Sequence, residues 1–174
     1  TFDKGAKGIK ATLDEFDSLG LGQAGMARTP DEIEPKVFNV KGINVAHLSY
    51  TYGFNGISAP NDEAWRSARI EPTRIITDAQ KARDMGARVV IVSMHWGRET
   101  QTELSEFQLT NADAITKSGL IDLVIGHHAH VVQKIDKVND VWAIFGLSNL
   151  ISYLPTTNAF SANTQDGIIA TTYI

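Results

Sequence analysis

The sequence predicts an α/β fold in which parallel strands alternate with helices. Residues 89–94 and 120–125 are short apolar runs rich in branched side chains, and they have the length of buried strands. Between them, apolar residues recur at helical spacing over 104–115, and Gly119 ends the run. A strand, a helix and a strand in this order predict a right-handed crossover, so the two strands should be parallel neighbours in one sheet.

The N-terminal part of the chain predicts a helix, a short helical turn and a hairpin. Apolar residues recur every three or four positions over residues 6–19, and Gly20 follows as a stop signal. Thr29 precedes Pro30 and two acids, which is typical of a helix start. Residues 37–40 and 43–50 flank Lys41-Gly42, and a two-residue connection containing glycine predicts a β-hairpin.

The remaining segments complete the predicted order. Residues 51–69 form a long connection rich in Gly, Ser, Asn and Pro, which we expect near the functional site or over it. An apolar stripe over 75–85 predicts a helix that leads into strand 89–94. Residues 131–135, 141–145 and 167–173 are predicted as strands separated by polar segments.

Composition bounds the class of protein. The 174 residues suit one globular domain, and 43% hydrophobic with 21% charged residues is ordinary for one. Lys and Arg are dispersed and the net charge is −4, which argues against a nucleic-acid partner. Apolar runs stay well short of the roughly 18 residues of a membrane span. The absence of cysteine excludes thiolate sites and disulfides.

Four of the five histidines follow the two central predicted strands. His95 follows the first, and Gly126-His127-His128-Ala129-His130 follows the second. Ligand sites collect at the carboxyl ends of parallel strands, and neutral imidazole is the commonest metal ligand. Two histidines one residue apart can face one ion if the backbone bends, which Gly126 would permit. We therefore predict a metal site first and general acid/base work second.

Other residues keep alternative roles at this stage. His47 is alone within a hairpin strand and is assigned a structural role. Glu99, four residues after His95, is a ligand, a partner orienting an imidazole, a proton carrier or a solvated loop acid. Asn149 follows a strand-like run, where a turn amide is the favoured interpretation. For Arg98 a surface role is favoured over binding of an anionic substrate.

Two segments resemble signatures of one bacterial family. Residues 95–99, His-Trp-Gly-Arg-Glu, are similar to the HWGxE signature of the capsule synthesis proteins called CapA, or poly-γ-glutamate synthesis proteins. Residues 125–133 are similar to the IGxHxHVVQ signature of the same family. Residues 1–5, 48–51 and 146–150 are similar to further family segments, so the resemblance covers nearly the whole chain.

The resemblance implies a fold and a ligand set. It implies the calcineurin-like metallophosphoesterase superfamily, whose fold is an α/β/β/α sandwich with a metal centre at the strand ends. His95 would be the isolated ligand, and His128 and His130 the HxH pair, with a divalent Mn, Zn or Fe as cofactor. Glu99 or Asp3 would steer protons. His127 falls at a position that varies in the family and is left out.

The resemblance also implies an incomplete domain. The family's Gly-Asp and Asn-Asn-His motifs lie upstream of residue 1, and Asp3 alone remains of the second. Residues 1–174 are therefore expected to be one domain truncated at the N-terminus, and at the C-terminus too because residue 174 falls within a predicted strand. The ligands that remain need not suffice to hold the cation. Exposed strand edges would favour homo-oligomers.

Three functions compete. The first is capsule or poly-γ-glutamate synthesis at the bacterial cell surface, with the capsule synthesis machinery as partner and any membrane anchor outside this chain. The second is a metal-dependent phosphoesterase hydrolysing a small molecule. The third is a metal-free, polymer-binding or structural fragment. The first is preferred with hydrolysis left open, although the net negative charge counts against direct binding of an acidic polymer by this piece.

Overall fold

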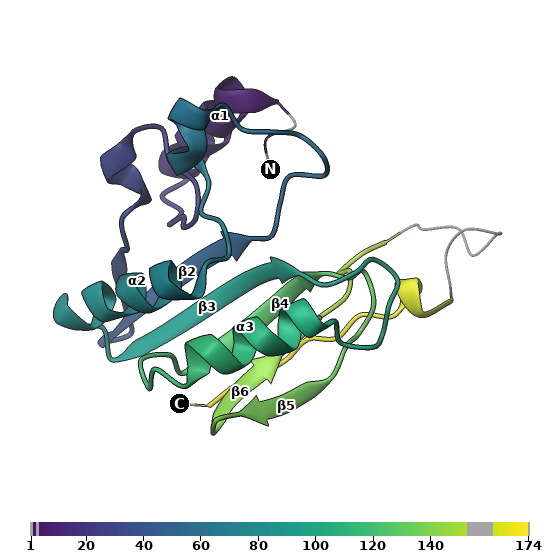
Figure 1. The fold of residues 1–174 in the computed structure, drawn as a ribbon. Helices are drawn as coiled ribbons and strands as arrows, with labels where there is room; N and C mark the ends of the chain where they lie inside the picture. Colours follow the sequence, from purple (N-terminus) through teal and green to yellow (C-terminus); the bar gives the residue numbers. More distant parts are fainter. Residues whose placement is uncertain (1, 3, 153–161, 174) are drawn as a thin grey trace.

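The computed structural model describes residues 2, 4–152 and 162–173. They form one six-stranded mixed sheet, and two of the three α-helices in this part of the chain cover one face of it (Figure 1). The strand order is β1-β2-β3-β4-β6-β5. The strands are β1 (Val37–Val40), β2 (Ile43–Thr51), β3 (Val89–Trp96), β4 (Leu123–His128), β5 (Ile135–Val138) and β6 (Val141–Ile144). The helices are α1 (Gly5–Ser18), α2 (Pro72–Asp84) and α3 (Glu106–Thr116), with 3-10 turns η1 (Pro30–Ile33), η2 (Asn61–Arg66) and η3 (Ala162–Gln165).

The four central strands are parallel, and each outer strand is antiparallel to its neighbour. Thr51 on β2 pairs with His95 on β3, which in turn pairs with His127 on β4. The carboxyl ends of these three strands therefore meet at one edge. This register confirms the predicted parallel crossover, which α3 completes after the Ser105–Gln108 capping box fixes its first turn.

The core lies between the sheet and helices α2 and α3. Alternate residues of β3 point toward α2 and α3 and are fully buried, namely Val90, Val92, Met94 and Trp96. They meet a helical layer of small and branched residues, namely Ile75, Ala79, Ala82, Ala112 and Ile115. In Figure 1 these helices cover the front of the sheet, and residues 170–173 pass behind β6.

The predicted hairpin is confirmed, and its turn explains why these residues fit there. Lys41 and Gly42 both have positive φ, 52° and 88°. Two left-handed residues in a two-residue loop match the twist of the flanking strands. The predicted N-terminal helix is also present as α1. It packs in a small separate cluster with Phe2 and Phe54, away from the sheet core (Figure 1).

Two predicted strands are wrong. Over 131–135, Val132 makes only an isolated bridge to Leu147, and β5 begins at Ile135. His130 has a positive φ of 57°, which turns the chain away from the direction of β4. The residues after it lead the chain back toward the sheet and pair regularly only from Ile135. Over 167–173, only Gly167 makes a bridge, to Ser148. β4 and β5 occupy both sides of β6, so this apolar segment finds no edge there and crosses the open face of the sheet.

These elements confirm the predicted α/β fold class. The described residues supply a helical layer and a sheet, which are two layers of the expected sandwich. Within the same ranges, every helix is too short or too polar to cross a lipid bilayer.

Candidate metal centre

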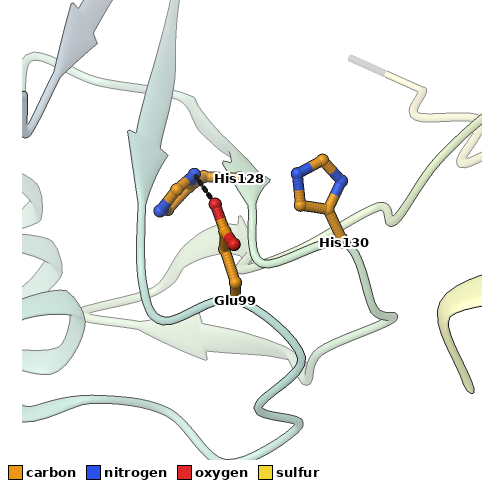
Figure 2. Close-up of side chains that lie close together, drawn as sticks. All are labelled: Glu99, His128 and His130. Carbon is orange, nitrogen blue, oxygen red and sulfur yellow. Dashed lines mark ion pairs between the residues drawn. The ribbon is translucent and has the colours of Figure 1, made fainter. Parts of the chain in front are cut away.

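The candidate site lies beyond the carboxyl ends of β3 and β4, where the histidines predict it. His128 is the last residue of β4, His130 follows in the next loop, and Glu99 comes from the loop after β3. One ligand atom from each of these residues lies within 4.8 Å of the other two. Figure 2 shows the Glu99 carboxylate directed at the His128 ring, with His130 beside them. The three residues can therefore share one cation.

The His128 ring is held as a neutral imidazole. Its Nδ1 lies 4.0 Å from Glu99 Oε1, and its side chain is 6% exposed while that of Glu99 is 57% exposed. Burial lowers the pKa of His128, and the Glu99 carboxylate opposes this effect only in part. A neutral imidazole keeps the nitrogen lone pair that a metal ion requires.

His130 is oriented by Asn149. The His130 Nδ1 lies 2.7 Å from Asn149 Oδ1, and Asn149 Nδ2 donates to the Thr164 carbonyl oxygen at 3.2 Å. Since the amide nitrogen faces a carbonyl, the amide oxygen must face the ring and accept from its Nδ1–H. This tautomer leaves the Nε2 of His130 free to bind a metal. The turn-amide interpretation of Asn149 misses this contact.

His95 packs against the cluster. The ring centroids of His95 and His128 lie 4.5 Å apart, and the Tyr52 ring stacks on His95 at 5.9 Å and 11°. Burial, and then the neighbouring His128, lower the pKa of His95 to about 4, so the ring is neutral. The converging ligand atoms described above belong to Glu99, His128 and His130, so the ligand role of His95 stays a prediction.

Strained backbone shapes the site. In the strand register His128 lies opposite Trp96, whose side chain points to the helical face, so the His128 ring would be expected on that face as well. Instead, the His128 ring contacts His95 on the other face of the sheet. A φ of +98° at His128 ends the strand and redirects the ring. Thr100 and Ser148, in the adjoining loops, also have positive φ, 64° and 66°. Such conformations persist only where the surroundings enforce them.

Gly126 serves a purpose other than the predicted bend. A Cβ on Gly126 would lie 1.8 Å from the Phe145 carbonyl oxygen and 2.5 Å from Trp96 Nε1. The Trp96 indole donates to that same oxygen at 3.0 Å, and its ring stacks on Phe145. Glycine is therefore required for close approach of β4 to this contact, while the bend itself occurs at His128.

The other candidate residues lie around this cluster or outside the described part of the chain. His47 Nε2 shares a 2.8 Å hydrogen bond with Ser93 Oγ on the open face of the sheet, in line with a structural role. His127 is exposed beside His95. Asp3 lies outside the described residues. The Tyr52 ring lies 4.7 Å from that of His128. Tyr52 was not singled out from the sequence, although it is the second residue of the long 51–69 connection expected near the site.

Comparison with known proteins adds family relationships. Residues 1–154 match the family described as bacterial capsule synthesis protein PGA_cap. The chain is 31% identical over 153 residues to the capsule biosynthesis protein CapA of Bacillus anthracis, covering 86% of this chain and 37% of that protein. It is 28% identical over 158 residues to the PGA biosynthesis protein CapA of Bacillus subtilis (strain 168), covering 86% and 39%. The chain thus spans less than two fifths of these relatives.

Two solved structures are similar over part of the fold. A sulfate thiohydrolase SoxB from Thermus thermophilus aligns with a TM-score of 0.46 and 22% identity, over 66% of this chain and 19% of that one. A putative 5'-nucleotidase from Staphylococcus aureus aligns with a TM-score of 0.44 and 18% identity, over 64% and 23%.

Proposed function

Because the chain belongs to the family of bacterial capsule synthesis proteins, we propose that it acts in poly-γ-glutamate capsule synthesis at the cell surface, with the capsule synthesis machinery as its partner. The proposed site of action is a metal centre beyond β3 and β4. The observation that supports it most is the convergence of Glu99, His128 and His130, whose ligand atoms lie within 4.8 Å of one another.

The donor set fits a divalent transition metal. Two imidazoles and one carboxylate are typical ligands of Zn, Mn and Fe, whereas Mg and Ca prefer oxygen alone. The Nε2 of His130 is free because Asn149 holds its Nδ1–H, and burial keeps His128 neutral. We propose that His128 and His130 hold the ion, with His95 as a further nitrogen ligand and with Glu99 beside the ion, as an oxygen ligand or as a proton carrier. Such an ion would polarise a phosphoryl or carbonyl oxygen and favour deprotonation of water.

Phosphoester hydrolysis is the second candidate, and the exposure of Glu99 favours it. This carboxylate is 57% exposed and lies 4.0 Å from the buried His128 ring. It can therefore reach both solvent water and the ligand cluster, which is what a proton carrier in a hydrolase requires. Asp3 is proposed as a second proton carrier.

Metal analysis tests the centre directly. The protein is equilibrated with Mn, Zn or Fe salts, desalted and analysed for bound metal. Bound metal is expected in the wild type and lost in His128→Ala. His47→Ala is the matched control, because it removes a strand histidine bonded to Ser93 and should retain the metal. A metal-free wild type would leave a polymer-binding or structural role.

Two assays separate the polymer role from hydrolysis. Turnover of phosphoester substrates that needs added Mn or Zn and falls in Glu99→Gln would favour the hydrolase. Retention of poly-γ-glutamate without product formation would favour the polymer role. If neither turnover nor retention occurs in the metal-loaded protein, both candidate functions are wrong for this chain.

A further inference from the structure

We propose that Gln133, together with Gln108, is a positioning residue that holds the loop bearing Glu99 against the loop bearing His128 and His130. The two buried amides would thereby keep Glu99, His128 and His130 close together before any cation binds. This inference deepens the proposed metal centre and rests on it for its functional meaning. Its structural content can be tested without metal.

The two amides form a buried hydrogen-bonded pair. Gln108 Nε2 donates to Gln133 Oε1 at 2.7 Å, and the two residues are 0% and 3% exposed. The Oε1 of Gln108 accepts from both the backbone N–H and the hydroxyl of Ser105, each at 3.0 Å. Polar groups at this depth are costly to leave without partners. The pair therefore favours one arrangement of the segments that supply its partners.

Gln133 joins each segment that carries a site residue. Its Nε2 donates to the carbonyl oxygen of Gln101, two residues after Glu99, at 2.9 Å. Its backbone N–H donates to the Gly146 carbonyl oxygen at 3.0 Å, on the segment that leads to Asn149. Gln133 itself follows His130 by three residues. One side chain and its backbone thus link the carboxylate, the HxH pair and the amide that orients His130.

One backbone hydrogen bond joins the loop bearing Glu99 directly to the loop bearing His128 and His130. The Thr100 N–H donates to the Ala129 carbonyl oxygen at 2.7 Å. Thr100 follows Glu99, and Ala129 lies between His128 and His130, so this bond ties the two ligand loops together. Thr100 adopts a φ of +64°, which is unfavourable for a threonine. A strained residue needs support from its surroundings, and the nearby Gln133–Gln101 bond supplies it.

Close packing around the Gln108 and Gln133 amides limits which side chains can replace Gln133. A Cβ on Gly97 would lie 3.0 Å from Gln108 Nε2, and a Cβ on Gly146 would lie 3.0 Å from Gln133 Oε1. Glycine therefore allows the backbone to lie flat against each amide. An apolar residue of similar length at 133 would fill the space but would leave the Gln101 carbonyl and the Gln108 amide without their partner.

The first experiment measures Zn²⁺ affinity by competition with a chromogenic chelator, using the full chain. Gln133→Met is expected to bind Zn²⁺ about 10- to 100-fold more weakly than the wild type, as is typical when the support of a ligand is lost. Tyr50→Phe is the control. It removes the buried 2.9 Å bond from the Tyr50 hydroxyl to Asp78 on the helical face and should leave Zn²⁺ affinity unchanged.

The second experiment measures amide hydrogen exchange at Thr100 in protein kept free of metal by a chelator. Exchange at Thr100 should be at least about 10-fold faster in Gln133→Met and unchanged in Tyr50→Phe, because local opening of the loop exposes this N–H. If Gln133→Met does not fold, Gln133→Asn keeps an amide that is one methylene too short and is measured in the same way.

The outcomes separate this inference from the proposed metal centre. A wild type that binds no Zn²⁺, with faster Thr100 exchange in the variant, would end the metal centre and support the loop-holding role. Equal Thr100 exchange in the folded variant and the wild type would overturn the inference whatever the metal result. Faster exchange with unchanged Zn²⁺ affinity in a wild type that does bind the ion would overturn the positioning role.

Discussion

At the scale of single residues, the candidate site depends on neutral hydrogen-bond partners as much as on the three residues that could hold a cation. Asn149 fixes which nitrogen of His130 carries the proton, and the Thr164 carbonyl oxygen fixes which way the amide faces. No charged side chain takes part in this relay: a neutral amide and a backbone carbonyl oxygen set the orientation of the ring. The outer partner of a ligating histidine sets both ring orientation and tautomer.

Replacing Asn149 by alanine tests this relay. Asn149→Ala is expected to weaken Zn²⁺ or Mn²⁺ binding about 10- to 100-fold, because the His130 ring loses the acceptor that holds Nε2 toward the site. The measurement is a chelator competition titration. Asn139→Ala is the control, since Asn139 bonds Asp113 and Thr116 away from the site. An affinity equal to that of the wild type would remove Asn149 from the site.

The buried histidines make stability depend on pH in one direction. The pKa of His95 is about 4 in the folded protein against 6.5 ordinarily, because the ring is buried and lies beside His128. Between these values the unfolded chain takes up a proton at His95 and the folded chain does not. The free energy of unfolding therefore falls as pH drops through this window. Above it both states are neutral at this residue, and His95 adds no pH dependence.

Urea unfolding with a chelator present checks this expectation. The midpoint should be lower at about pH 5 than at about pH 7, and the drop should be smaller in His95→Gln, which cannot titrate. Partial desolvation of the rings also lowers the pKa values of His47, His127 and His128, so part of the drop should persist in the variant. A drop of the same size in both proteins would show that His95 titrates normally.

At the scale of elements, the contact between β4 and the segment after β6 decides where the histidines lie. Gly126 lets the Phe145 carbonyl oxygen approach β4, and Trp96 donates to that oxygen from β3. Three strand ends thus meet at one point just before His128 leaves the sheet. The position of His128 and His130 therefore depends on the packing of Gly126 against Phe145 and Trp96.

Gly126→Ala is expected to be strongly destabilising. Its Cβ would lie 1.8 Å from a backbone oxygen, which cannot move without displacing the end of β6, so a loss of about 3 kcal/mol or more is expected. Gly53→Ala is the control, since its Cβ would meet no atom within 4 Å, and it should change stability by less than about 0.5 kcal/mol. Urea unfolding measures both, and similar midpoints would contradict the packing argument.

The elements that could be predicted from sequence are those with a local signal. Apolar runs at 89–94 and 120–125 mark β3 and β4, and Lys41-Gly42 marks the hairpin turn. Residues 131–135 and 167–173 have an equally strand-like pattern but form only isolated bridges. An apolar pattern predicts a strand, but it does not indicate whether an edge of the sheet is free to receive that strand. Without such an edge, Ile169 and Tyr173 remain 85% and 93% exposed.

The same limit applies to the site. Four of the five histidines could be recognised from sequence because they lie at or just after the carboxyl ends of two strand-like runs, now β3 and β4. The contact of Asn149 with His130 spans 19 positions, and the Gln108–Gln133 pair spans 25. No periodic pattern links such residues. The reorientation of His128 depends on its positive φ, which could not be predicted from sequence because residues other than glycine rarely adopt this conformation.

At the scale of the whole molecule, the sheet is covered unevenly. α2 and α3 bury one face, while the described part of the chain covers the other face only in part, with residues 170–173 near β6. Each outer strand is paired on one side only within this part. Val40 on β1 and Ile135 on β5 are 51% and 44% exposed. Unpaired strands bearing apolar side chains are templates for pairing with another chain.

We therefore expect this 174-residue chain to self-associate through one outer strand. Light scattering after gel filtration over a range of concentrations should show a mass that rises with concentration. A lysine at the edge opposes pairing, so Val40→Lys or Ile135→Lys should return the chain to a monomer, and the effective variant identifies the strand used. Leu21→Lys is the control, because Leu21 is 53% exposed and lies outside the sheet. A wild type that stays monomeric at every concentration would show that these edges are protected without a partner.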